Sequence, residues 1–579
     1  MFNSSAAHLF IDIPIEVFHC QIFIHFEYSW VYRVFRLICR QCNCIATGTS
    51  TNYSFGNELH VYLRNDIHRT RRFVECCEKG YFQHVNGLKI FGGQELSQFS
   101  KDMDLEDELL HTNEEEFATR LDRYLNCFPN LQKLELAKRY FDHSVVKGMA
   151  SFQNLKSLTH LDLSSAQVHD KSIQIIASNP LFSNLTFLNL SQTKTSIVSV
   201  QSICSSPYMS NLKELQYSRC RMGDVLLHDI SQSMFLKNLT SLHVSGNNIT
   251  SSGVKYIGKS SVFNNLTCLH IDINEISEDG IVYLASCENL SNVETFNFEF
   301  NISNGTHSNL IATILNGPMK KLKRVRFSSK GLSDIEKLVA CKNITSLKSL
   351  NLMCGSITDD EWKLITNCSG LSNLEALQLD CTHITNLTPL ATSEYIKNLT
   401  SLEISGNYAF KESAFIELTK EFPKLKQLCI SDYRHSITID TVLHALEHHL
   451  QCLETLTMRC IDFVSCEKVE QFASLDSASK LVSLCVTLKK GFIPYLFGKA
   501  SKLENLTRLC ILEPPIELDD AHALASTPLL SQLTHLQLPG FYGSRIANVK
   551  KQVTQILEKS PYLYKVNGGE KNQFESAFW

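Results

Sequence analysis

One short pattern, Leu-x-x-Leu-x-Leu, recurs through most of this 579-residue chain. Its first clear copy consists of Leu131, Leu134 and Leu136. Later copies start at Leu158, Leu185, Leu212, Leu239, Leu266, Val293, Leu322, Leu347, Leu374, Leu399, Leu425, Leu453, Leu481, Leu506 and Leu533, with a degenerate copy at Leu563. The starts from Leu131 to Val293 are each 27 residues apart, and the later intervals lie between 25 and 30 residues. A period of this length predicts a stack of similar structural units.

Each unit contains two kinds of periodicity. The first half alternates between apolar and polar residues with a period of two, which predicts a short strand. In the copy that starts at Leu158, the positions +10, +14 and +18 hold Val168, Ser172 and Ile176, the spacing of one helix face. A strand and a helix of this size cannot bury their apolar sides alone, so we expect neighbouring units to stack.

The repeat resembles the leucine-rich-repeat family in its longer, ribonuclease-inhibitor-like form. The resemblance implies an α/β solenoid of about seventeen turns. We expect a curved horseshoe with a parallel β-sheet on its concave face and helices on its convex face. The predicted organisation is a small helical module at 9–47, a connecting region at 48–130, the solenoid at 131–568 and a tail at 569–579. The connecting region holds a degenerate first repeat around 85–90 and an acidic loop at 101–116.

The repeat also predicts which side chains face a partner. Residues at +2, +4 and +6 of each copy alternate with the buried leucines and so line the concave face. His243 and His270 share one column in adjacent turns, about 4.8 Å apart, and an acidic pair, Asp272 and Glu299, precedes the basic pair Arg324 and Arg326. The candidate partner-binding residues are His243, His270, Asp272, Asn297, Glu299, Arg324 and Arg326. The alternative is that these are ordinary solvated strand residues.

Residues 9–47 do not follow the repeat and read as two short helices joined by a turn. They resemble an F-box in the pairs Ile13-Pro14, Glu16-Val17 and Ile22-Phe23 and in the stretch Ile38-Cys39-Arg40. Two features depart from that family: Cys42 stands where a Trp is usual, and the middle turn reads Glu27-Tyr28-Ser29-Trp30. The resemblance implies docking on a Skp-type adaptor and a cullin through Pro14, Glu16, Val17, Ile22 and Phe23. The alternative is a helical cap that covers the first repeat.

Composition narrows the classes of protein that fit. The 55 basic and 59 acidic side chains give a net charge of −4, which does not favour nucleic-acid or membrane-surface binding. The first residues lack the features of a signal peptide, and charged residues interrupt the apolar stretch 17–46. We therefore expect the 21 cysteines to be reduced thiols that fill the core, and the protein to be soluble and cytoplasmic or nuclear.

No convergent catalytic set is evident in the sequence. A CxxC pattern at Cys39 and Cys42 and a helical spacing of His444, His448 and Cys452 are possible metal ligands, but core and solvent-facing roles are favoured for both. We expect no catalysis, metal or cofactor. The sequence thus predicts a protein-binding protein, specifically a substrate receptor of a cullin–RING ubiquitin ligase in ubiquitin-dependent protein catabolism. The alternative is a plain leucine-rich-repeat scaffold, and a metal- or redox-dependent enzyme is the third interpretation.

Overall fold

The structure is a computed structural model of the chain. It describes residues 21–23, 58–62, 87–91, 130–136, 143–150, 152–299, 301, 310–326, 335–352, 357–380, 384–405, 411–431, 436–498, 500–512, 518–527, 533, 535–537 and 556. The chain divides into two compact units. The first comprises Met1–Val293 with Asn301–Ser303, and the second comprises Glu294–Phe300 with Asn304–Trp579.

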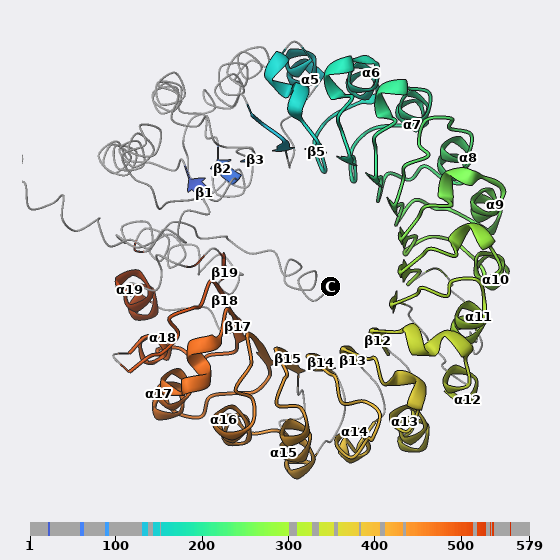
Figure 1. Ribbon diagram of the computed structural model, residues 1–579. Helices are drawn as coiled ribbons and strands as arrows, with labels where there is room; N and C mark the ends of the chain where they lie inside the picture. Colours follow the sequence, from blue (N-terminus) through green and yellow to red (C-terminus); the bar gives the residue numbers. More distant parts are fainter. Residues whose placement is uncertain are drawn as a thin grey trace, which may run out of the picture. The chain divides into compact units, whose positions relative to one another are not determined.

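In the first unit, parallel strands pair in the order of the sequence (Figure 1). The described helices α5–α10 follow strands β4–β9 and pack side by side on the face of the repeats opposite the strands. The strands are β1 (Gln21–Phe23), β2 (Glu58–Tyr62), β3 (Gly87–Phe91), β4 (Lys133–Glu135), β5 (His160–Asp162), β6 (Phe187–Asn189), β7 (Glu214–Gln216), β8 (Ser241–His243) and β9 (Cys268–His270). The helices are α5 (His143–Met149), α6 (Asp170–Ser178), α7 (Ile197–Cys204), α8 (Val225–Ser231), α9 (Ser251–Lys259) and α10 (Glu278–Ala285). Short 3-10 helices such as η7 (Pro180–Phe182) lead into the next strand.

The second unit is built in the same way, with consecutive strands paired in parallel. Its strands are β10 (Thr295–Asn297), β11 (Arg324–Arg326), β12 (Ser349–Asn351), β13 (Ala376–Asp380), β14 (Ser401–Ser405), β15 (Gln427–Ser431), β16 (Thr455–Arg459), β17 (Ser483–Val486), β18 (Arg508–Ile511) and β19 (His535–Gln537). Its helices are α11 (Leu310–Asn316), α12 (Ile335–Val339), α13 (Asp359–Thr366), α14 (Thr388–Ala391), α15 (Glu412–Glu421), α16 (Ile439–His448), α17 (Cys466–Ser474), α18 (Ile493–Leu496) and α19 (Leu518–Ser526). The predicted solenoid fold is confirmed in each unit.

The leucines of the repeat form the core. In the copy that starts at Leu158, the side chains of Leu158, Leu161 and Leu163 are all 0% exposed. The strand residues on either side of Leu161 are half-buried, as the period-two prediction requires. Several cysteines, including Cys204 and Cys485, are free thiols buried among these apolar residues.

The predicted helices are present, but they begin later than the apolar spacing indicated. Val168 and Ile249, both at +10, are buried but precede helices α6 and α9. Thr250 explains the start of α9, because its side chain accepts a hydrogen bond from the backbone N–H of Ser252 and caps the helix. Position +10 therefore belongs to the loop, and the predicted helix face starts at +14.

Asparagine side chains connect successive repeats. At several repeat starts, the preceding residue is an Asn whose side chain donates to a backbone carbonyl of the previous repeat, as Asn238 does to Ser210 at 2.9 Å and Asn265 to Lys237 at 3.0 Å. A second, buried set lies at +8. Asn247 Nδ2 lies 2.7 Å from the carbonyl oxygen of Tyr217, and Asn274 Oδ1 accepts hydrogen bonds from backbone N–H groups of the preceding repeat. These amides satisfy backbone groups that the short strands leave unpaired.

The amino-terminal region departs from its predicted form where the structure describes it. Ile22 and Phe23 lie in strand β1, which pairs with β2, so the prediction of a helix was wrong at these residues. A run of apolar residues is compatible with either element, and pairing with a neighbouring strand decides between them. The rest of the module, with Pro14, Glu16 and Val17, lies outside the described residues, as does the acidic loop. Strand β3 confirms the predicted strand near Ile90.

Candidate functional site

The candidate site of the first unit is the row of side chains on strands β5–β9. The backbone register aligns Asp162, Asn189, Gln216, His243 and His270 in one column. A second column at +2 contains His160, Phe187, Glu214, Ser241 and Cys268. The leucines between the columns are buried, so the columns stand on a rigid layer. The predicted columns at +2 and +4 are thus present across these strands.

Asp162 anchors the first end of this row. Its carboxylate accepts hydrogen bonds from the backbone N–H of Ser164 at 2.7 Å and from Asn189 Nδ2 at 3.1 Å. Burial raises the pKa of Asp162 above its usual value, and the hydrogen bonds from Ser164 oppose this effect. Beside it, the rings of His160 and Phe187 stack with centroids 5.5 Å apart. This end offers a carboxylate and a flat aromatic surface.

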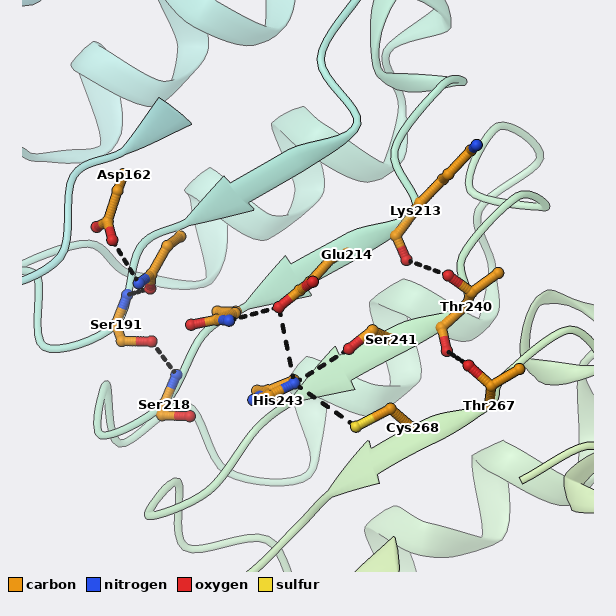
Figure 2. Close-up of polar contacts among 12 residues, drawn as sticks. Asp162, Ser191, Lys213, Glu214, Ser218, Thr240, Ser241, His243, Thr267 and Cys268 are labelled. Carbon is orange, nitrogen blue, oxygen red and sulfur yellow. Dashed lines mark hydrogen bonds and ion pairs between the residues drawn. The ribbon is translucent and has the colours of Figure 1, made fainter. Parts of the chain in front are cut away.

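His243 is the centre of the other end, as Figure 2 shows. Its Nε2 atom lies 3.0 Å from Ser241 Oγ, 3.8 Å from Glu214 Oε1 and 3.8 Å from Cys268 Sγ. Gln216 Nε2 donates to Glu214 Oε1 at 2.6 Å and so orients that carboxylate. Burial lowers the pKa of His243 to about 4, which keeps the imidazole neutral at neutral pH.

The side chains of the two predicted histidines are in contact. The ring centroids of His243 and His270 are 4.2 Å apart, with the ring planes inclined by 40°. Asp272 follows on the same chain segment and accepts a hydrogen bond from Ser245 Oγ at 2.5 Å. Cys268 was not among the predicted site residues. Its place beside His243 depends on the neighbouring strand, although its +2 position in the repeat was visible in the sequence.

The other predicted residues lie in the second unit. Asn297 and Glu299 are each only 5% exposed, and the Arg326 Nε atom is 3.7 Å from Glu299 Oε1. Arg324, in register with Thr295, is exposed. Because Asn297 and Glu299 are buried, Arg324 and Arg326 are the predicted residues of this unit that a partner can reach. Asp272 belongs to the first unit and Glu299 to the second.

The sequence offered two other sets of candidate metal ligands, one on helix α16 and one in the CxxC pattern. On α16, the rings of His444 and His448 are 4.6 Å apart. Among the described residues, the set of three ligating side chains that comes close enough to share a metal ion is His243, Cys268 and His270, not this one. The cysteines of the CxxC pattern lie outside the described residues. None of the described helices is both long enough and apolar enough to cross a membrane.

One comparison with known proteins, a scan of family models, matches the repeat. A family model described as "Leucine Rich repeat" matches residues 154–177 and 235–258. No curated protein sequence matches the chain. Among solved structures, an internalin from Listeria monocytogenes is similar, with 19% sequence identity, a TM-score of 0.28, and coverage of 68% of this chain and 83% of the internalin. The fold assignment rests on the ladder of strands and the buried leucines described above.

Proposed function

We propose that this chain is a non-catalytic, protein-binding scaffold. The observation that carries the proposal is the alignment of two polar columns across β5–β9 above a fully buried leucine layer. A rigid row of this kind presents hydrogen-bonding groups at fixed spacing without the cost of ordering them on binding. The aromatic stack of His160 and Phe187 adds the type of flat apolar surface that protein interfaces favour.

Site-specific photo-crosslinking in cells tests the proposal. A photoreactive amino acid replaces Gln216 on the strand face in one variant and Lys255 on helix α9 in the other. We expect a discrete cross-linked protein from position 216 and none from position 255. The matched pair lies in the same unit, so equal labelling at both positions would remove the assignment of the strand face as the binding face.

A second test concerns the arginines of the second unit. Reversing both charges, Arg324→Glu and Arg326→Glu, is expected to abolish capture of a partner identified by cross-linking. The control variant Lys320→Glu with Lys342→Glu makes the same change of net charge at exposed residues outside strand β11. Unchanged capture by the arginine variant would exclude this part of the surface from the interface.

We further propose that the partner is a substrate of a cullin–RING ubiquitin ligase and that the chain is its receptor. The support is the F-box-like sequence pattern at 9–47, and strand β1 differs from the helix that this pattern implies at Ile22 and Phe23. A pull-down with a Skp-type adaptor tests it. If deleting residues 1–50 leaves recovery of the adaptor and cullin unchanged, the F-box-like assignment of 9–47 is wrong. If the full chain recovers neither protein, the plain-scaffold alternative holds. The proposal also implies a cytoplasmic or nuclear location, which fluorescence microscopy can test.

A further inference from the structure

Three metal-ligating side chains converge on the strand face of the first unit. His243 on β8 and Cys268 and His270 on β9 have ligand atoms within 4.8 Å of one another. Strand register fixes this arrangement, because Ser241 pairs with Cys268 and His243 pairs with His270. All three side chains are half-buried, so an ion could reach them from solvent.

The spacing suits a small tetrahedral ion. Zinc binds thiolate sulfur at about 2.3 Å and imidazole nitrogen at about 2.0 Å, which separates neighbouring ligand atoms by roughly 3.3–3.6 Å. The Nε2 atom of His243 and the Sγ atom of Cys268 are 3.8 Å apart. Small side-chain rotations therefore suffice to bring these two ligands to bonding distance.

A candidate fourth ligand lies beside His243, outside the group formed by His243, Cys268 and His270. Glu214 on the neighbouring strand β7 has its Oε1 atom 3.8 Å from His243 Nε2, and Gln216 donates a hydrogen bond to the same oxygen. Carboxylate oxygen is a regular zinc ligand, and Gln216 would orient it as outer-sphere groups do in metal sites. The four groups come from three adjacent strands.

We propose that His243, Cys268 and His270 bind a zinc ion and that the carboxylate of Glu214 completes its coordination. A thiolate with two imidazoles is a softer ligand set than magnesium or calcium prefers, which favours zinc among the abundant divalent ions. Binding would release the thiol proton of Cys268 and would tie β7, β8 and β9 together. The proposal goes beyond protein binding and does not depend on it, because the ligands all belong to this chain.

Metal titration of the full chain tests the site. The protein is stripped with a chelator under reducing conditions and titrated with zinc, and cobalt(II) is used as a spectroscopic substitute. The background carries Cys39→Ser, Cys42→Ser and Cys44→Ser, which removes the CxxC pattern as a competing site. In this background we expect one tightly bound zinc per chain, a thiolate-to-cobalt charge-transfer band, and a higher thermal midpoint with zinc.

Ligand variants and a matched control separate the proposed site from other thiols. Cys268→Ser is expected to abolish the charge-transfer band, and His270→Asn to weaken zinc binding by more than about 100-fold, because losing an outer-sphere group alone costs 10–100-fold. Glu214→Gln should weaken binding less than His270→Asn, by about 10–100-fold, because a water molecule can take the fourth position on zinc. Cys452→Ser, which removes an exposed thiol in the second unit, should change nothing.

Two results would overturn the proposal. One is a cobalt band and zinc stoichiometry that survive Cys268→Ser, and the other is their loss in Cys452→Ser. Circular dichroism of each apo variant shows whether it is folded. If the apo form of Cys268→Ser fails to fold, the His270→Asn variant provides the test instead. The proposed site is wrong if this variant binds zinc with an affinity within threefold of the background protein.

Discussion

His243 and His270 occupy equivalent positions in adjacent parallel strands, and their ring centroids are 4.2 Å apart. This is slightly closer than the strand spacing of about 4.8 Å, and the ring planes are inclined by 40°. The leucine between the two columns of each strand, Leu242 in β8 and Leu269 in β9, is fully buried. The geometry of the imidazole pair is therefore set by the packing beneath it.

Leu242→Ala should destabilise the first unit by about 2–5 kcal/mol, because it leaves a cavity in the leucine layer directly between Ser241 and His243. Urea unfolding followed by circular dichroism measures the loss. The control is Val225→Ala on helix α8, a side chain that is 47% exposed, for which we expect a change within about 0.5 kcal/mol. Similar losses for both variants would contradict the core assignment of Leu242.

Asn247→Ala should cost at least about 2 kcal/mol, because it leaves buried backbone groups of two repeats unpaired. Asn265→Ala is the matched control. Its side chain is exposed and makes one hydrogen bond to the Lys237 carbonyl, so its loss should cost less than about 1 kcal/mol. Urea unfolding of the two variants measures the difference. Equal losses would show that the buried amide of Asn247 contributes no more to the free energy of unfolding than the exposed amide of Asn265.

The strand phase of the repeat was predictable, because the alternation of buried and half-buried residues is local and leucine is strongly biased to the core. The columns followed directly from that phase. The buried amides at +8 were missed because the position is variable: Asn247 and Asn274 carry the amide, but Ala166, Thr193 and Cys220 occupy the same place in earlier repeats. The sequence of one repeat therefore does not reveal that buried asparagines at +8 bond to backbone groups of the neighbouring repeat.

The missed features depend on contacts between repeats. Cys268 lies beside His243 because strands β8 and β9 pair, and its residue type alone did not indicate a place in the site. The helix starts depend on caps such as Thr250, which a spacing of apolar residues does not contain. Strand β1 depends on pairing with β2, and a short apolar run by itself fits a helix as well. Local sequence patterns thus predicted the strand and helix of each repeat. Contacts between neighbouring repeats determine the place of Cys268, the helix starts and the strand β1.

Glu412 should make the stability of the second unit depend on pH. Its Oε1 atom accepts hydrogen bonds from Thr438 N at 2.9 Å and from Thr441 Oγ1 at 2.7 Å. Hydrogen bonds from Thr438 and Thr441 lower the pKa of Glu412 below its ordinary value of 4.5. The resulting stability is fully present above the unfolded-state pKa and is lost as the pH falls through the lower folded-state pKa.

Glu412→Gln should therefore lower the urea midpoint at neutral pH and flatten its decline on acidification between about pH 7 and pH 3. Because Glu412 is largely solvated, the effect is expected to be modest. The control Glu417→Gln removes the same charge from the same helix, α15, and the Glu417 carboxylate accepts a hydrogen bond from Thr388 instead of Thr438. If both variants show the same pH dependence as the parent chain, Glu412 does not contribute to it.

Ile273 carries a backbone strain that its substitution should relieve. It has a φ of 54°, in the left-handed region, and it is a β-branched residue for which that conformation is unfavourable. The equivalent position in other repeats also has a positive φ but holds residues that are not β-branched, such as Ser165, Gln192, Arg219 and Gly246. Left-handed backbone costs a residue with a Cβ atom about 1–2 kcal/mol, and Asn tolerates it better than most. The Ile273 side chain is 43% exposed, so little core packing is lost when it is replaced.

Ile273→Asn should accordingly stabilise the first unit by on the order of 1 kcal/mol, which corresponds to roughly 2–4 °C in the thermal midpoint. Val282→Asn is the control: Val282 is 42% exposed on helix α10 and has no strained backbone, so its replacement should be neutral or destabilising. Differential scanning calorimetry measures both midpoints. A fall of equal size in the two variants would mean that loss of apolar contact outweighs backbone strain at Ile273. A rise for Ile273→Asn alone would show that relief of backbone strain outweighs the lost apolar contact at this turn.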